Sequence, residues 1–455
     1  MRQFYSFFLL TFASLLSAAL SAQTNVSAII SSNQTWSPLG SPYIISQNIL
    51  IDSGVSVNIL PGTIIQCTGA FRLIVDGELK ANGTKDSMVV MDKVRIEFNK
   101  KAVGYNFNNA SGSQFNYTWF KGDGLGGVNT IKLNDVSLFV TNSRFTNCYY
   151  AIYAYGSSYD TTKIKVTKTR FESDNGYGSP TSVSGNLLFL EMDECSVYNM
   201  CGMYVPANFK LTRSDINKLT CNGGIRVMNG NRTAKGNTHI ACNSFRNFKT
   251  NVLEAFYLDT NTTVNILNNT FDSADVFINF YASINNNYKY HVSGNNFLTA
   301  RLYDVKFTGS SQTAGQFVRH NMNNNYWGST DSATIAAGIY DFNDDITAAY
   351  KVDFSNYLSS ANTNCSVNTT GLTFQQHQSF SVFPNPGKGQ LTLNFNEADS
   401  RLFFLYDLQG RQLLQGAITE AQFKLDVSQC LSGTYMLMVR NANGTMHSQK
   451  ISIMQ

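Results

Sequence analysis

The stretch TTVNILNNTF, residues 262–271, sets an alternating apolar run directly before two asparagines and a phenylalanine. The stretch KYHVSGNNF, residues 289–297, ends in the same way, so that Phe297 follows Phe271 by 26 residues. Short runs of β-branched and aromatic residues bounded by Asn and Gly are typical of strands, whereas helical repeats are longer units with a helical period. We therefore expect a short β-unit that recurs along the chain.

Nine such units follow one another, and each ends in a closing residue. The closing residues are Phe120, Phe145, Phe171, Cys195, Ile216, Phe245, Phe271, Phe297 and Tyr326. The steps between them are 25, 26, 24, 21, 29, 26, 26 and 29 residues, and a period this regular predicts a solenoid. Five positions before each closing residue lies a second apolar residue, and only Asn321 interrupts this column. Two apolar columns in register predict a stacked core.

The position two before each closing residue is always small and polar. It is occupied by Thr118, Ser143, Thr169, Asp193, Ser214, Asn243, Asn269, Asn295 and Asn324. Such residues suit a tight turn, because Asn tolerates left-handed backbone angles and bonds to nearby backbone groups. Identical amides stacked about 4.8 Å apart also bond to one another. The four consecutive asparagines therefore predict an asparagine ladder.

These features resemble the right-handed parallel β-helix family, also called pectate-lyase-like. Residues 48–84, with their PGT and GELKANGT turns, are similar to the opening coils of such surface proteins, and residues 323–345 are similar to a closing segment. The resemblance covers about residues 24–358 and implies an all-β solenoid. Residues 329–339, STDSATIAAGI, favour a short helix that covers the open end of the solenoid, where unpaired backbone groups would otherwise recruit another chain.

The N-terminus, MRQFYSFFLLTFASLLSAALSAQ, is typical of a secretory signal peptide over residues 1–22, cut near Ala22 and Gln23. No other apolar run is long enough to span a bilayer, so we expect a mature chain without a transmembrane segment. The formal net charge of +4 falls to +3 when Arg2 is removed, which gives no indication of a nucleic-acid partner.

The C-terminal part changes from repeats to alternating strands with turns. We expect the β-helix over residues 23–358, a polar linker over 359–378 and a small immunoglobulin-like β-sandwich over 379–455. The ordered motifs PNPGKG, YDLQGR and LSGTY closely resemble the type A sorting domain of the type IX secretion system of Bacteroidetes. The residues that carry the resemblance are Pro384, Asn385, Pro386, Gly389, Gly410, Arg411, Gly433 and Tyr435. The resemblance implies export by that machinery, followed by release or attachment to the outer cell surface.

Catalytic candidates come from the column directly before the closing residues. Arg170, Glu194 and Asp215 follow one another there, after Arg144, and Arg213 offers a further cation. If Glu194 and Asp215 lay on adjacent coils they would be about 5 Å apart, a separation compatible with paired-carboxylate chemistry. The same residues also describe a surface charge ladder. The five histidines are scattered, so zinc and triad chemistry have no constellation on which to build.

Ligand-binding candidates are the tyrosines of CYYAIYAYGSSY: Tyr149, Tyr150, Tyr153, Tyr155 and Tyr159. They suit a platform for sugar rings, although the alternation along a strand would also bury some of them in the core.

Metal and disulfide chemistry are less determined. Asp341, Asn343 and Asp345 have the opening of a calcium loop, but the Gly and Glu of an EF-hand are missing, so either a looser calcium site or a solvated acidic turn fits. No other cofactor is indicated. Cys365 is expected to pair with Cys430 or with nothing, and Cys201 and Cys221 are expected to stack as a disulfide or as buried thiols.

Two functional classes remain open. The leading expectation is a binding or adhesive protein that recognises a polysaccharide or a cell-surface glycan. The alternative is a polysaccharide lyase or glycosidase that works in the β-helix groove, which the resemblance to pectate-lyase-like proteins implies.

Overall fold

The computed structural model describes residues 23–454 apart from 123–128, 157–161, 186, 221–223, 229–235, 257–261, 282–288, 309–314, 366–379, 396–397, 408–411 and 442–445. The expected signal peptide, residues 1–22, lies outside the described residues. The chain divides into two compact units, Met1–Leu372 and Thr373–Gln455. The first is a parallel β-solenoid and the second a small β-sandwich, which confirms the predicted fold class.

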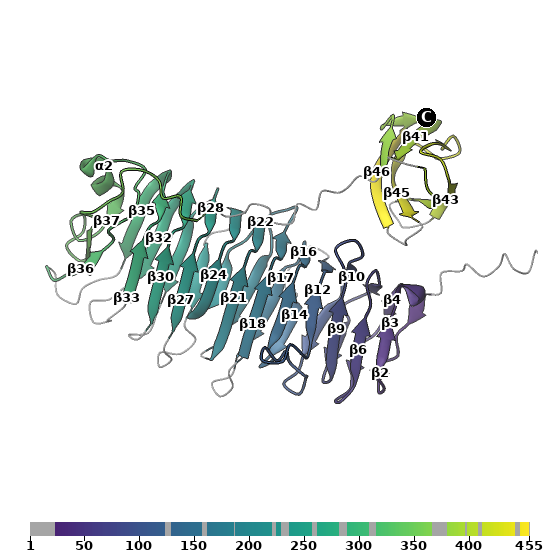
Figure 1. The fold of residues 1–455 in the computed structure, drawn as a ribbon, viewed down its shortest axis with the longest axis horizontal. Helices are drawn as coiled ribbons and strands as arrows, with labels where there is room; N and C mark the ends of the chain where they lie inside the picture. Colours follow the sequence, from purple (N-terminus) through teal and green to yellow (C-terminus); the bar gives the residue numbers. More distant parts are fainter. Residues whose placement is uncertain are drawn as a thin grey trace, which may run out of the picture. The chain divides into compact units, whose positions relative to one another are not determined.

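Three parallel sheets form the solenoid, and each coil adds one strand to each sheet (Figure 1). Sheet A contains β1 (Thr24–Asn25), β4 (Tyr43–Ile45), β7 (Ile64–Cys67), β10 (Val89–Asp92), β13 (Thr118–Lys121), β16 (Arg144–Thr146), β19 (Arg170–Glu172), β22 (Ser196–Met200), β25 (Asp215–Leu219), β28 (Ser244–Arg246), β31 (Thr270–Asp272) and β34 (Asn296–Phe297). A 3₁₀ helix, η1 (Pro38–Gly40), lies directly before β4 in the chain.

Sheet B contains β2 (Ile29–Ile30), β5 (Ile49–Ile51), β8 (Arg72–Val75), β11 (Arg95–Phe98), β14 (Asn129–Asn134), β17 (Tyr150–Tyr155), β20 (Ser179–Ser184), β23 (Met203–Pro206), β26 (Ile225–Met228), β29 (Asn251–Phe256), β32 (Ala274–Tyr281), β35 (Ala300–Thr308) and β37 (Ile339–Tyr340). Sheet C contains β3 (Gln34–Trp36), β6 (Ser56–Ile59), β9 (Glu78–Asn82), β12 (Gln114–Asn116), β15 (Leu138–Thr141), β18 (Thr162–Thr167), β21 (Leu188–Asp193), β24 (Asn208–Thr212), β27 (Asn237–Ala241), β30 (Thr263–Leu267) and β33 (Lys289–Ser293).

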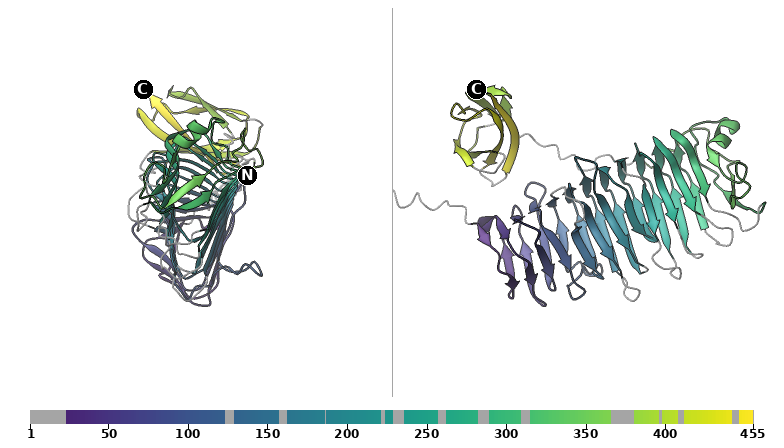
Figure 2. Two further views of the ribbon diagram at one scale, coloured as in Figure 1. Left: turned by 90° about the vertical axis from the view of Figure 1, so that its left-hand side faces the viewer. Right: turned by 180° about the vertical axis from the view of Figure 1, so that it is seen from behind.

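The core is built from stacked columns of identical or similar side chains. Phe120, Phe145 and Phe171 stack with ring centroids 4.4 and 4.9 Å apart. These distances match the spacing of neighbouring strands, so each closing residue packs on the one below it. Seen along the solenoid in the left view of Figure 2, the coils superpose. The predicted inward columns are therefore real.

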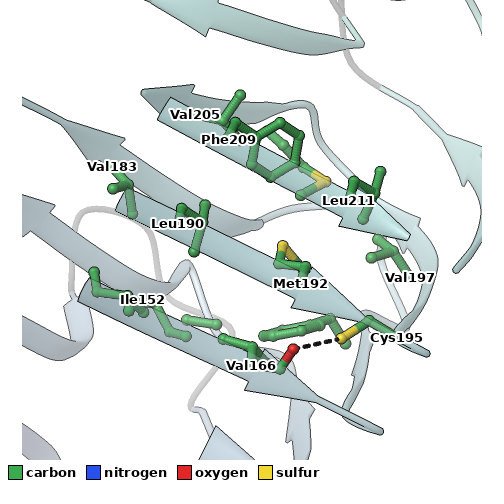
Figure 3. Packing of buried hydrophobic residues seen from close by; sticks show 14 of the residues in the cluster. Ile152, Val166, Val183, Leu190, Met192, Cys195, Val197, Val205, Phe209 and Leu211 are labelled. Carbon is green, nitrogen blue, oxygen red and sulfur yellow. Dashed lines mark hydrogen bonds between the residues drawn. The ribbon is translucent and has the colours of Figure 1, made fainter. Parts of the chain in front are cut away.

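The predicted register was wrong at the fourth coil. Phe171 pairs with Val197, not with Cys195, so Val197 is the closing residue of that coil. Cys195 occupies the small polar column instead: its amide donates to the Ser214 hydroxyl at 3.0 Å, and its buried thiol is directed at the Val166 carbonyl (Figure 3). A thiol fills a ladder position almost as a serine does, and its apolar character made it look like a closing residue.

The ninth coil needs the same kind of correction. Asn325, not Asn324, lies in the ladder, and Trp327 packs on Phe297 with ring centroids 4.8 Å apart. The residue five positions before Trp327 is Met322, which is fully buried. The apparent interruption at Asn321 was therefore an error of one residue in the alignment.

Left-handed backbone angles lie one position before the ladder. Positive φ values of 45 to 62° recur there at Tyr117, Asn142, Lys168, Glu194, Arg213, Cys242, Asn268 and Asn324. The prediction that the ladder asparagines themselves adopt such angles was wrong. The side chains of the ladder residues instead form hydrogen bonds with backbone groups of the neighbouring coils.

The closing segment covers the C-terminal end of the solenoid. The helix α2 (Ser332–Ala337) begins after Asp331, whose carboxylate accepts a hydrogen bond from the Thr334 amide at 2.9 Å, and it buries Ile335. Two further strands, β36 (Val318–Asn321) and β38 (Tyr350–Asp353), pair in parallel beside it. The helix predicted over residues 329–339 is thus present in a shorter form (Figure 1).

After this cap the chain turns back along the asparagine-ladder side, and we call residues 354–365 the return segment. Asn362 bonds with Asn268, Gly294 and Asn296 at 2.6 to 3.0 Å. Cys365 then forms a disulfide with Cys242. The prediction that Cys365 pairs with Cys430 or with nothing was wrong, because the return segment runs back over several coils, and Cys430 is a buried free thiol in the other unit. Cys201 is disulfide-bonded, and Cys221 lies outside the described residues.

The second unit consists of two antiparallel sheets around their own core. One contains β39 (Phe380–Phe383), β41 (Gln390–Phe395) and β44 (Gln422–Asp426). The other contains β40 (Gly387–Lys388), β46 (Met446–Met454), β45 (Gly433–Asn441), β42 (Arg401–Tyr406) and β43 (Gln412–Ile418). Leu391, Leu405, Leu437 and Ile451 are fully buried between the sheets. Only β40 and β46 pair in parallel within this unit, among the residues that the structure describes.

Candidate functional site

The predicted tyrosines lie on and beside β17, on the outer face of sheet B. Along β17 the apolar residues Ala151, Ile152 and Ala154 are buried, whereas Tyr150 and Tyr153 are half-buried and Tyr155 is exposed. The alternation of the strand directs the Tyr153 and Tyr155 rings outward. Tyr150 stands at the first position of β17 and is half-buried. Tyr159 lies outside the described residues.

A pocket of about 180 Å³ lies next to these tyrosines, where the turns from sheet A enter sheet B. Four tyrosines from successive coils line it, together with one serine, one cysteine, three glycines and one arginine. The lining residues are Tyr149, Tyr150, Tyr177, Gly178, Ser179, Cys201, Gly202, Tyr204, Gly224 and Arg226. Tyr153 and Tyr155 do not line it. Sequence reasoning had selected Tyr149 and Tyr150 but missed Tyr177, Tyr204 and Arg226, which no shared motif connects.

Glycine allows the coils to approach closely at the pocket. A Cβ atom added to Gly178 would lie 2.1 Å from the Cys148 carbonyl oxygen, and the φ of Gly178 is +89°. At Gly224 an added Cβ would lie 2.1 Å from the Val252 carbonyl oxygen. Both positions exclude any larger residue, which leaves the space above them to the tyrosine rings.

Charge in the pocket is held by one ion pair. The Nε atom of Arg226 donates to Oε2 of Glu254 at 2.7 Å, and the Asn251 amide donates to the other carboxylate oxygen, also at 2.7 Å. The Glu254 side chain is only 5% exposed. The Arg226 guanidinium lies over the Tyr204 ring, 5.8 Å from its centroid.

The environment of Tyr150 favours its protonated hydroxyl. Burial, followed by the neighbouring Tyr149, raises the pKa of Tyr150 above its ordinary value of 10. The rings of Tyr149 and Tyr150 pack edge to face with centroids 4.6 Å apart. The pocket therefore offers apolar ring faces together with neutral hydroxyl donors, a combination that suits sugar rings.

Of the four catalytic candidates, the structure brings Glu194 and Arg213 into contact but places Asp215 and Arg170 in separate salt bridges. Glu194 lies on a turn between Lys168 and Arg213, with nitrogen–oxygen distances of 3.9 and 3.1 Å. Asp215 is in register with Ser196 and pairs with Arg246 at 2.7 Å. The expectation that Glu194 and Asp215 stack was wrong, because it rested on Cys195 as the closing residue.

Arg170 belongs to a further ion pair. Its Nε atom lies 2.6 Å from Oε2 of Glu172, and Arg144 binds the other oxygen of the same carboxylate. The carboxylates and cations singled out in the sequence are therefore shared among separate salt bridges on the surface. This arrangement is that of a charge ladder, the alternative that the sequence had left open.

The calcium candidates use their oxygens within the protein. Asp341 is buried, and its two carboxylate oxygens accept from the Asn343 and Val352 amides at 2.7 Å. Asp345 accepts from the amide and hydroxyl of Thr347. Among the described residues no group of three or more His, Cys, Asp or Glu side chains is placed to hold a metal ion. Asp341 organises the closing turn from the inside, so the idea of a solvated acidic turn is also corrected at this residue.

The sorting motif closes the β-sandwich. The Asn385 side chain accepts from the Ser452 amide at 2.8 Å, and Gly389 has a φ of +67°. Tyr435, which follows Gly433, donates from its hydroxyl to the Leu431 carbonyl at 2.6 Å. Pro384 and Pro386 flank Asn385 in the turn before β40, whereas Gly410 and Arg411 lie outside the described residues.

The fold defines a protein of the parallel β-helix class that carries a separate β-sandwich at its C-terminal end. Residues 381–454 of that sandwich match the family of secretion system C-terminal sorting domains. This tail directs export by type IX secretion, to the cell surface or into the medium, as the sequence motifs had predicted. No curated protein matches the chain. In the described part of the chain no helix is long and apolar enough to cross a membrane.

Proposed function

We propose that this exported β-helix is a glycan-binding, adhesive protein and that the tyrosine-lined pocket on sheet B is its ligand site. The observation that carries the proposal is the convergence of Tyr149, Tyr150, Tyr177 and Tyr204 from three successive coils around one cavity. Aromatic rings bury large apolar area at a small entropic cost and stack on the apolar faces of sugars.

The charge distribution favours binding over hydrolysis or elimination. Glu194, Asp215 and Arg170 each have an oppositely charged partner and lie in separate salt bridges. A lyase or glycosidase needs a base and carboxylates that face one substrate. The part of the pocket lining that the structure describes contains one arginine and no carboxylate.

Glycan-array binding of the secreted mature chain tests the proposal. We expect retention on a subset of glycans and its loss in Tyr204→Ala, because that ring lines the pocket. Tyr198→Ala is the matched control, since Tyr198 is 41% exposed on sheet A and does not line the pocket. Equal retention by Tyr204→Ala and the wild type would contradict this site.

Enzymatic activity is tested on the same preparation with pectins, alginates and glycosaminoglycans, with and without calcium. Formation of unsaturated products and of reducing ends is followed. Turnover that Glu194→Gln abolishes would replace the binding function by the lyase or glycosidase alternative.

A further inference from the structure

We infer that the pocket takes a single uncharged sugar ring, presented at the end or at a branch of a glycan chain, and not a run of acidic sugars. This inference rests on the glycan-binding function proposed above and names its ligand class. It follows from the size of the pocket, from its charge and from its neighbours.

Size limits the ligand to one ring. The pocket measures about 180 Å³, below the roughly 300–1,000 Å³ that hold drug-sized ligands. The adjoining cavity, which shares Tyr149, measures only about 20 Å³ and has room for little more than a water molecule. A polysaccharide that ran along the solenoid would need several such cavities in sequence, whereas a chain end or branch needs one.

Charge selects against acidic sugars. Among the described residues Arg226 is the only charged side chain of the lining, and the almost fully buried Glu254 neutralises it at 2.7 Å. The carboxylate of a uronic acid would have to compete with Glu254 for Arg226 and would be buried without a partner if it failed. A neutral sugar meets no such penalty.

The remaining polar groups are neutral and suit hydroxyl groups of a sugar. Tyrosine hydroxyls both donate and accept, and Ser179 adds one more hydroxyl at the wall of the pocket. The Arg226 guanidinium is fixed by Glu254 beside the Tyr204 ring. Sugar hydroxyls accept from the tyrosine and serine hydroxyls while ring carbons pack on the Tyr149 and Tyr204 rings.

The nearest competing site for an anion lies at the smaller cavity. Lys93, Arg95 and Lys121 line it, and burial lowers the pKa of Lys121 below its ordinary value of 10.5. These cations draw acidic chains to the surface outside the tyrosine pocket. Retention of acidic glycans that is lost in Tyr204→Ala but kept in Lys121→Ala would therefore overturn the inference.

The test measures binding of the mature chain to methyl glycosides of glucose, galactose and mannose and of glucuronic and galacturonic acid. We expect at least one neutral glycoside to bind and to compete the protein off array glycans, while uronosides do neither. In Glu254→Gln the Arg226 charge loses its partner, so binding of a uronoside should rise about tenfold or more while binding of the neutral glycoside falls.

Glu191→Gln is the matched control. Glu191 is also a buried ion-paired glutamate, with three lysines at 3.2 to 3.6 Å, but it lies on sheet C away from the pocket lining. Its removal should leave both affinities unchanged. Acidic oligosaccharides that bind the wild type through internal units, uncompeted by any neutral glycoside, would overturn the inference but leave the glycan-binding function intact. An array on which no glycan is retained would overturn both.

Discussion

At the scale of single residues, the ladder shows how one asparagine side chain forms hydrogen bonds with the coils on both sides of its own. The carbonyl oxygen of the Asn269 side chain accepts from the backbone and the side-chain amide of Asn243 at 2.9 and 3.0 Å. Its own amide donates to the Ile240 carbonyl and to Asn295 at 2.9 and 3.0 Å. All these groups are buried, so no water replaces a lost partner.

Replacement of Asn269 by leucine should therefore cost about 2–5 kcal/mol of unfolding free energy, because several buried groups lose their partners. Urea unfolding followed by circular dichroism measures this cost. The control is Asn265→Leu on the outer face of the preceding strand β30, where the side-chain amide donates to Asn237 in an exposed contact. If both variants unfold at the same urea concentration, the ladder contributes no such stability.

The sequence predicted this ladder because small polar residues recurred at a constant place, yet it misplaced two of its members. Cys195 and Asn325 occupy ladder positions that the alignment had assigned to Asp193 and Asn324. In a sequence, a closing residue is recognised by its apolar character, because closing residues are buried. Cys195 is buried almost as completely as the phenylalanines of this column. Composition alone does not distinguish a small buried thiol in a turn from an apolar residue in the core.

At the scale of elements, the C-terminal cap holds two buried titratable groups with opposite effects on stability. His320, on β36, packs among Phe280, Phe307 and Tyr350, and its Nε2 atom has no hydrogen-bond partner among the residues that the structure describes. Burial, followed by the nearby His291, lowers the pKa of His320 from 6.5 to about 4. Burial raises the pKa of Asp304, on β35, from 3.8 to about 7.

The pH dependence follows from the protons that each state binds. Between pH 6.5 and 4 the unfolded chain protonates His320 and the folded one does not, so stability falls as the pH is lowered through this range. Between pH 4 and 7 the folded chain keeps Asp304 protonated and the unfolded one does not, so stability falls as the pH is raised. The effect amounts to about 3 kcal/mol for His320 and about 4 kcal/mol for Asp304, and the two oppose each other.

We therefore predict that the unfolding free energy of each single variant depends on pH, whereas the two dependences cancel in the wild type. Asp304→Asn should lose stability when the pH falls from 6.5 to 4, and His320→Phe should lose stability when the pH rises from 4 to 7. Urea midpoints measured across this range check both slopes, with the wild type nearly flat between pH 4 and 6.5. Parallel curves for all three proteins would show that neither group titrates as its burial implies.

The return segment is a second element that contributes to the stability of the solenoid. The disulfide joins Cys242 to Cys365 across 123 residues of sequence and fastens the segment to the middle of the solenoid. Removing both cysteines as alanines should lower stability by about 2–5 kcal/mol and release residues near 362 to added protease. Mass spectrometry of limited digests locates the cut. The wild type under non-reducing conditions is the reference, and identical digestion of both proteins would mean that the hydrogen bonds of Asn362 suffice.

At the scale of the whole molecule, the solenoid and the sorting sandwich have separate hydrophobic cores. Deletion of residues 380–455 should therefore leave the β-helix folded but retained in the periplasm of the native host. Cell fractionation, with circular dichroism of the retained protein, checks this expectation. A truncated chain that still appears outside the cell in normal amounts would show that export does not depend on the tail.

The sequence by itself determined the class of fold and the export route. A solenoid core requires an apolar residue at the same place in every coil, so the fold is visible in the sequence as a regular repeat. The sorting domain is visible as motifs within one short stretch. Local motifs and regular repeats can be recognised in a sequence without knowledge of long-range contacts.

Only the tertiary structure decided which side chains of different coils are neighbours, because this depends on the number of residues in each turn. Coils of unequal length shift one column against the next, and a shift of two residues separated Glu194 from Asp215 and placed Val197 beside Phe171. For the same reason the sequence did not predict that Tyr149, Tyr177 and Tyr204 meet at one pocket, or that Cys365 reaches Cys242. Side chains from different coils become neighbours through stacking, which sequence spacing describes only when every coil has the same length.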